Sequence, residues 1–61
     1  MANITAKELT ALEDQIASEQ NLVKKCKAMA DLCNDTVIRQ TLENAAITHQ
    51  QHVDSLVTFL R

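Results

Sequence analysis

The amino-acid sequence predicts an all-α fold, in which an antiparallel helical hairpin pairs with a second copy to form a four-helix bundle. The chain has 61 residues, enough for one small domain, and contains neither glycine nor proline, so nothing breaks a helix from within. Its β-branched residues never alternate with polar ones over the length of a strand. Apolar residues instead recur at spacings of three and four in two segments of similar length.

The first helix is expected over about residues 5–33. It begins with a capping box, since Thr5 is followed three residues later by Glu8. Apolar residues then follow one another along a seam, which Leu22 and Met29 widen. The seam consists of Leu9, Leu12, Ile16, Glu19, Val23, Cys26, Ala30 and Cys33.

Asn34 and Asp35 form the only turn-like pair, in which Asn tolerates the left-handed conformation that ends a helix and Asp caps the next one. The second helix is expected over about residues 36–60, and so short a connection makes the helices antiparallel neighbours. Ala46, Val53 and Leu60 widen its seam. The seam residues are Ile38, Leu42, Ala45, His49, His52, Leu56 and Phe59.

One polar layer interrupts these two apolar seams. When the chain folds at its turn, residues whose numbers sum to about 69 lie at the same height, because both helices rise equally per residue. By this rule the other facing pairs are apolar, whereas Glu19 lies level with Gln50, between His49 and His52. Polar residues placed on the seams by chance would more often be scattered along the bundle.

A carboxylate buried in such a layer needs a companion, because burying it alone costs several kcal/mol. Two solutions are open: a hydrogen-bonded ion pair between Glu19 and protonated histidines, or a metal ion held by Glu19, His49 and His52. Two nitrogens and one oxygen suit a divalent transition metal, zinc or iron first, with nickel, copper or manganese as alternatives. In the metal-free alternative the chain is a structural or interaction hairpin whose polar layer only fixes register.

A homodimer is expected because two helices cannot enclose so wide an apolar face. The polar layer lies about halfway along both helices. A two-fold axis perpendicular to the bundle at that height would bring both copies of the layer into one cage, large enough for a dinuclear site. An offset dimer would instead contain two separate sites of three ligands.

The segments "LEDQIASEQNLVKKCKAMADLCND" and "ENAAITHQQHVDSL" resemble short ferritin-like hairpin proteins of spore-forming bacteria, related to the spore coat F domain. The resemblance implies a ferritin-like four-helix arrangement of two hairpins and an association with the spore or its coat. It gives Glu19 and His49 the Glu and His roles of a ferritin-like metal site. The second Glu of that pattern falls at Ala46, which disfavours iron oxidase chemistry and favours a nitrogen-rich metal site.

Composition and motifs disfavour several other functions. The net charge of −2 disfavours nucleic-acid binding, and no apolar run is long enough to span a membrane, so we expect a cytoplasmic protein. Cys26 and Cys33 are then expected to be free thiols.

The sequence contains no nucleophile elbow, phosphate loop or catalytic triad, which favours binding over catalysis. The weakest hypothesis is a redox enzyme that acts on oxygen or peroxide at a dinuclear centre, because the polar layer offers fewer carboxylates than such centres use.

Overall fold

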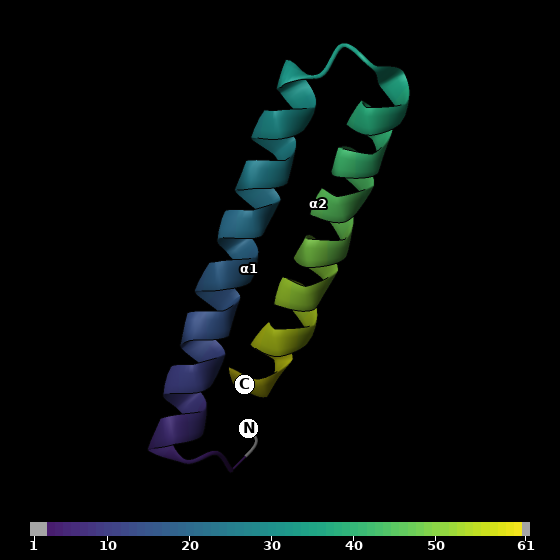
Figure 1. The fold of residues 1–61 in the computed structure, drawn as a ribbon. Coiled ribbons are helices and arrows are strands. Elements are labelled where there is room, and N and C mark those ends of the chain that lie inside the picture. The colour runs from purple at the N-terminus through teal and green to yellow at the C-terminus, as the bar shows by residue number, and fades with distance from the viewer. Residues whose placement is uncertain (1–2, 61) are drawn as a thin grey trace.

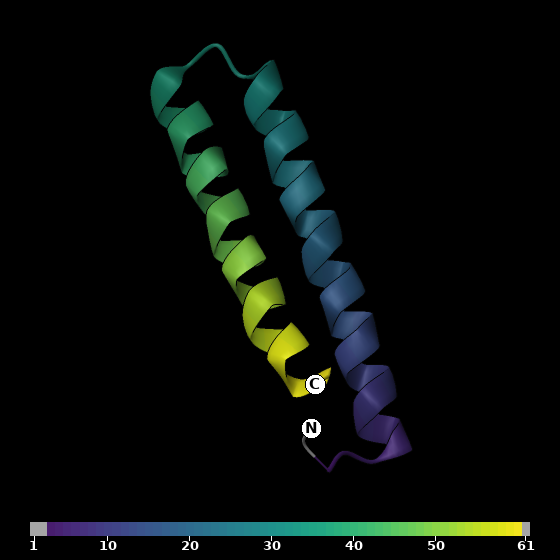
Figure 2. The same cartoon turned by 180° about the vertical axis from the view of Figure 1, so that it is seen from behind.

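The chain forms a helical hairpin, as seen in a computed structural model that describes residues 3–60. Helix α1 (Ala6–Leu32) and helix α2 (Thr36–Val57) lie side by side in antiparallel orientation, and η1 (Thr58–Leu60) adds a 3-10 turn (Figures 1 and 2). The described residues contain no strand, and the Cα trace measures 46 × 14 × 10 Å. The predicted all-helical hairpin is confirmed, while its dimerisation stays a prediction.

Helix α1 begins at the predicted capping box. The hydroxyl of Thr5 accepts a hydrogen bond from the backbone N–H of Glu8 at 3.1 Å, and the Glu8 carboxylate accepts one from the N–H of Thr5 at 2.9 Å. Two N–H groups that have no partner within the helix are thereby satisfied. The backbone hydrogen bond from Thr5 is the main reason that the pKa of Glu8 is lowered.

The corner between the helices is built differently from the expected one. Asp35 caps α2 as predicted, its carboxylate accepting from the N–H groups of Val37 (2.9 Å) and Ile38 (3.0 Å). No residue between 3 and 60 has a positive φ, so Asn34 does not end α1 in the left-handed conformation. Instead Cys33 is extended, and its carbonyl accepts two hydrogen bonds from the Arg39 guanidinium, at 2.7 and 3.2 Å. A cation therefore complements the negative end of the α1 dipole.

The core of the hairpin is narrow and lies along one line between the helices. Its buried apolar residues are Ile16, Val23, Cys26, Ala30, Ala46 and Val53. Glu19 is the only charged residue among the buried ones that the structure describes.

The packing of α2 corrects the predicted seam. Ala46 and Val53, expected only to flank it, are the residues that α2 buries against α1. The seam residues Ile38 and Phe59 are 53% and 51% exposed, and Leu9 on α1 is 38% exposed. A single partner helix covers only part of a wide apolar face, so α2 turns one side of that face to α1 and leaves the rest open.

Neither helix in the described part of the chain combines the length and apolarity that crossing a lipid bilayer requires.

Candidate metal site

Glu19, His49 and His52 meet at the middle of the hairpin. Nδ1 of His49 lies 2.6 Å from one carboxylate oxygen of Glu19, and Nδ1 of His52 lies 3.2 Å from the other. The two imidazole rings are 5.6 Å apart between centroids and are nearly perpendicular, at 83°. One ligand atom from each of the three residues lies within 4.8 Å of the other two.

Helix geometry and the corner together produce this convergence. Thirteen residues separate Glu19 from each end of α1, so it is the central residue of that helix. His49 and His52 are spaced by three residues and project from neighbouring turns of α2 toward the same side. The corner at residues 33–35 then sets the register that places this histidine pair opposite Glu19. The predicted shared layer is therefore present in the structure.

The three side chains differ in burial, which corrects the expectation that both histidines lie in the core. The accessible fraction is 10% for the Glu19 side chain, 26% for His49 and 51% for His52. Three residues along a helix correspond to a turn of about 300°, so His52 lies about 60° further from α1 than His49 does. The site is thus closed on the Glu19 side and open on the His52 side.

The electrostatics of the site favour an ionised carboxylate. The hydrogen bond from His49 lowers the pKa of Glu19 below its ordinary value, partly opposed by burial, and the His52 hydrogen bond lowers it further. An ionised carboxylate only accepts hydrogen bonds, so each Nδ1 donates its hydrogen to Glu19. In a neutral imidazole this leaves the Nε2 lone pair of each ring free to accept a hydrogen bond or bind an ion.

The donor set fits a transition-metal ion. A tetrahedral site with bonds of ~2.1 Å separates neighbouring ligand atoms by about 3.4 Å. The ligand atoms, one from each of the three residues, lie within 4.8 Å of one another, so their separations need to change by no more than about 1.4 Å to reach that value. Replacing the two Nδ1 hydrogens by one ion would give a site with two nitrogens and one oxygen, which leaves a fourth position open.

No other part of the described chain offers a comparable group of potential metal ligands. Within the chain, Cys26 is a buried free thiol and Cys33 is a half-buried one. Cys26 lies seven residues from Glu19, about 10 Å along α1, which is too far for it to share an ion with that carboxylate. The sequence had already indicated every residue of the site; what it had not indicated was the exposure of His52.

Comparison of the chain with protein-family models, with curated proteins and with solved structures finds no match in any of the three. The resemblance to ferritin-like spore proteins therefore stays a prediction.

Proposed function

We propose that this chain is a metal-binding protein that holds a divalent transition metal with Glu19, His49 and His52. The observation that carries the proposal is the convergence of one ligand atom from each of the three side chains within 4.8 Å, at the middle of a hairpin whose other buried residues are apolar. Two histidines from neighbouring turns of one helix and a carboxylate from the other form a chelating set, because each helix fixes its own ligands before the ion arrives.

The donor atoms narrow the choice of metal. Imidazole nitrogens suit zinc, iron, copper and nickel, while sites for magnesium or calcium are built from oxygen. Zinc and iron are our first candidates, and nickel, copper and manganese are the alternatives. With one carboxylate per chain the site is poor in the oxygen ligands that iron oxidases use, so we propose binding rather than catalysis.

Elemental analysis and thermal unfolding test this proposal. Protein purified without an affinity tag should contain close to one zinc or iron ion per chain, and chelation should lower its Tm, because the ion binds only the folded state. His49→Ala combined with His52→Ala should abolish both effects. Gln51→Ala, an exposed change on the same helix, is the matched control and should keep both. Equal metal uptake by the double variant and the control would contradict the proposal.

A second candidate function is favoured by the hydrogen bonds themselves. Both histidines already donate to Glu19, and no buried side-chain nitrogen or oxygen among the described residues lacks a partner. In this case the chain is a structural hairpin whose polar layer fixes its register, consistent with the spore-layer role that the resemblance implies. The purified protein would then be free of metal, and Glu19, His49 and His52 could all be replaced by Leu without loss of the fold.

A further inference from the structure

One long side of the hairpin is apolar and carries the open side of the candidate metal site. We call it the histidine face and define it by Leu22, Met29, Ile38, Ala45, His49, His52, Leu56 and Phe59. Ile38, Ala45 and His52 of α2 and Phe59 of η1 recur every seven residues, so they follow one side of the hairpin with a drift of only about 20° per repeat. Met29, Ile38 and Phe59 are 39%, 53% and 51% exposed, so this face is uncovered along its whole length.

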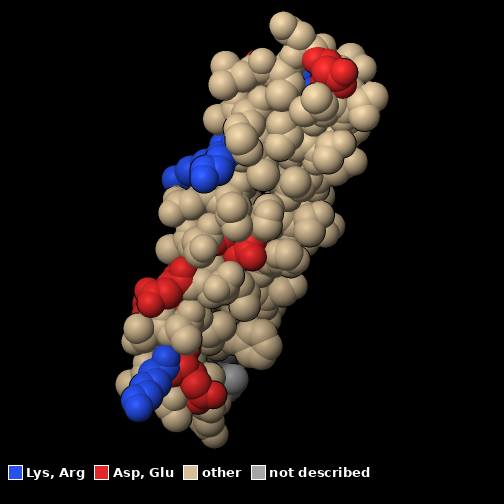
Figure 3. Space-filling view, in the orientation of Figure 1, with Lys and Arg blue, Asp and Glu red and all other residues tan. Residues whose placement is uncertain are grey.

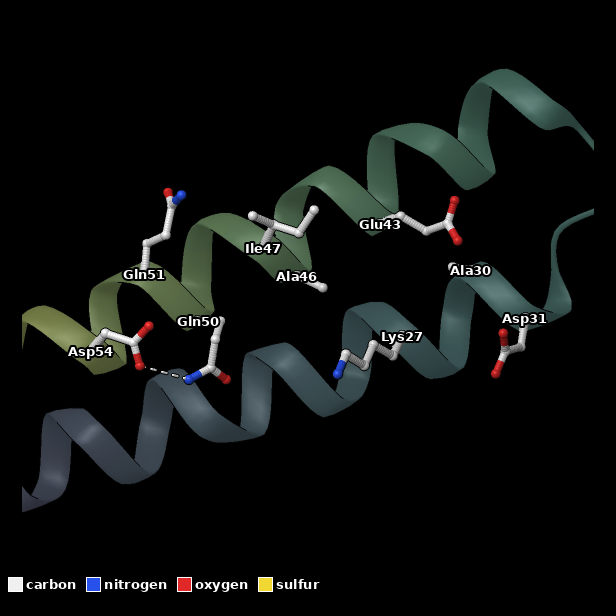
Figure 4. Close-up of a pocket in the computed structure, with 9 residues that line it drawn as sticks. All are labelled: Lys27, Ala30, Asp31, Glu43, Ala46, Ile47, Gln50, Gln51 and Asp54. Carbon is white, nitrogen blue, oxygen red and sulfur yellow. Dashed lines mark hydrogen bonds between the residues drawn. The ribbon is translucent and has the colours of Figure 1, made fainter.

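The other long side carries more charge, although Ile47 on that side is 57% exposed. Residues of both helices line a groove there, among them Lys27, Glu43 and Asp54, and the Gln50 amide donates to Asp54 at 3.0 Å (Figure 4). A quarter turn in the plane of the page brings the helices of Figure 4 into the arrangement of Figure 2, so the groove lies behind the face seen in Figure 1. In Figure 3, which has the orientation of Figure 1, charged side chains lie along the α1 edge and at the two ends, and one acidic patch lies near the middle of the face.

A second copy of the same chain is the occupant that the histidine face fits best. The face is nearly uncharged, so two copies can meet there without the repulsion that a net charge of −2 per chain would otherwise cause. The Cα trace of one hairpin is 46 Å long and 14 Å wide, so contact over the whole of one side would cover roughly 640 Å² for each copy, or about 1,300 Å² in total. This total lies within the range of specific, stable protein interfaces. Two hairpins packed in this way make a four-helix bundle with one continuous core.

Because the candidate metal site lies midway along the hairpin, the two copies of the site in such a dimer can lie at the same height. Two hairpins that pack face to face are related by a two-fold axis along the bundle, with both corners at one end, or across it, with the corners at opposite ends. In the first arrangement equivalent residues are always at the same height. In the second they are level only near the middle, which is where Glu19 lies in α1.

We propose that a second copy of this chain docks on the histidine face and that the two sets of Glu19, His49 and His52 then form one central dinuclear metal site. The docking follows from the uncovered face alone, while the dinuclear site rests on the proposed metal binding. Each carboxylate has two oxygens, so Glu19 can bind the ion of its own chain with one and the partner's ion with the other. The partner thereby supplies the fourth ligand that a single chain lacks, and it covers His52.

Molecular mass in solution and metal content, measured on the same full-length samples with and without zinc, test this inference. The wild-type chain should be a dimer that binds two zinc ions. Ile38→Glu places a charge in the histidine face, whereas Ile47→Glu, nine residues and two and a half helical turns away, places the same charge on the opposite side of α2. The two isoleucines are 53% and 57% exposed, so the pair of variants is closely matched.

We expect Ile47→Glu to remain a dimer with unchanged zinc affinity, and Ile38→Glu to be a helical monomer that binds zinc at least tenfold more weakly. Met29→Lys should behave like Ile38→Glu and serves if that variant does not fold. A wild-type chain that binds one zinc ion as a monomer would overturn the inference and leave the proposed function intact. A dimer without zinc would overturn the proposed function and the dinuclear site but not the docking. Equal dimerisation of both isoleucine variants would overturn the docking face.

Spectroscopy of copper-loaded protein separates one central site from two distant sites. Two Cu²⁺ ions held in one cage should give an electron paramagnetic resonance spectrum with magnetic coupling between the ions. An uncoupled spectrum from a dimer loaded with two copper ions would overturn the central site.

Discussion

Glu19 is the residue on which the chemistry of this hairpin depends. It is the one charged side chain among the buried residues that the structure describes, and both of its carboxylate oxygens face an imidazole nitrogen. A carboxylate in such a place stabilises the fold only while its partners remain, because removing them leaves a buried charge unpaired. Substitutions at this layer should therefore have effects that depend on pH and on metal.

The lowered pKa of Glu19 predicts an acid-sensitive fold. Because its folded-state pKa is below its ordinary value of 4.5, ionised Glu19 contributes stability that is fully present above about pH 4.5. That contribution is lost as the pH falls from there through the folded-state pKa. Urea unfolding of metal-free protein between pH 3 and 6 should show a steeper loss of stability for wild type than for Glu19→Gln. Parallel pH profiles for the two proteins would contradict the prediction.

The two histidines should contribute unequally to the metal-free fold. His49 makes the shorter contact with Glu19 and is the less exposed of the two, at 26% against 51%. His49→Ala should therefore lower the Tm of metal-free protein more than His52→Ala does. Zinc should leave this difference nearly unchanged, since the loss of either ligand should weaken binding by more than about 100-fold, beyond the usual cost of losing an outer-shell partner, so that zinc stabilises only the wild type. Thermal scans of both variants with and without zinc measure this.

At the scale of the helices, most of the structure could be predicted because local signals agree with the tertiary fold. The capping box at Thr5, the cap at Asp35 and the apolar spacing all indicate the same two helices. The shared layer also followed from the sequence, since two straight helices joined by a short turn have a determined register. The rotation of α2, which buries Ala46 and exposes His52, could not be predicted, because the apolar face of α2 is wider than one partner helix can cover.

The corner also shows what residue preferences leave undetermined. Asn34 permits a left-handed helix end but does not require it, and the structure instead uses an extended Cys33 with the Arg39 guanidinium on its carbonyl. That contact joins residues six positions apart across the turn, so no helical or turn pattern in the sequence indicates it. It makes Arg39 a link between the end of α1 and the first turn of α2.

Substitutions at the corner should therefore distinguish the contribution of the Asp35 cap to stability from that of Asn34 in the turn. Asp35→Ala removes the acceptor of two backbone N–H groups and should cost about 1 kcal/mol, or a fall in Tm of roughly 4–8 °C for a domain of this size. Asn34→Ala should leave the Tm nearly unchanged, because no described residue needs a left-handed conformation. Thermal unfolding followed by circular dichroism measures both. A larger loss for Asn34→Ala than for Asp35→Ala would contradict this account of the corner.

At the scale of the whole molecule, the hairpin has two unlike sides. The histidine face is apolar and uncovered, and the opposite groove carries charged residues from both helices. So narrow a core is a small source of stability for a chain of 61 residues. We therefore expect stability to depend on protein concentration. The Tm should rise as the concentration is raised from about 1 to 100 µM, because association stabilises the folded chain by mass action. A Tm independent of concentration would indicate that the hairpin is stable by itself.

The central claim is that Glu19, His49 and His52 bind one metal ion together, and X-ray absorption at the zinc edge of zinc-loaded protein tests it most directly. We predict nitrogen and oxygen neighbours at ~2.0–2.1 Å, with the outer-shell scattering of two imidazole rings per zinc. A sulfur shell at ~2.3 Å, which would place zinc on Cys26 or Cys33, or a shell without imidazole scattering would contradict the account.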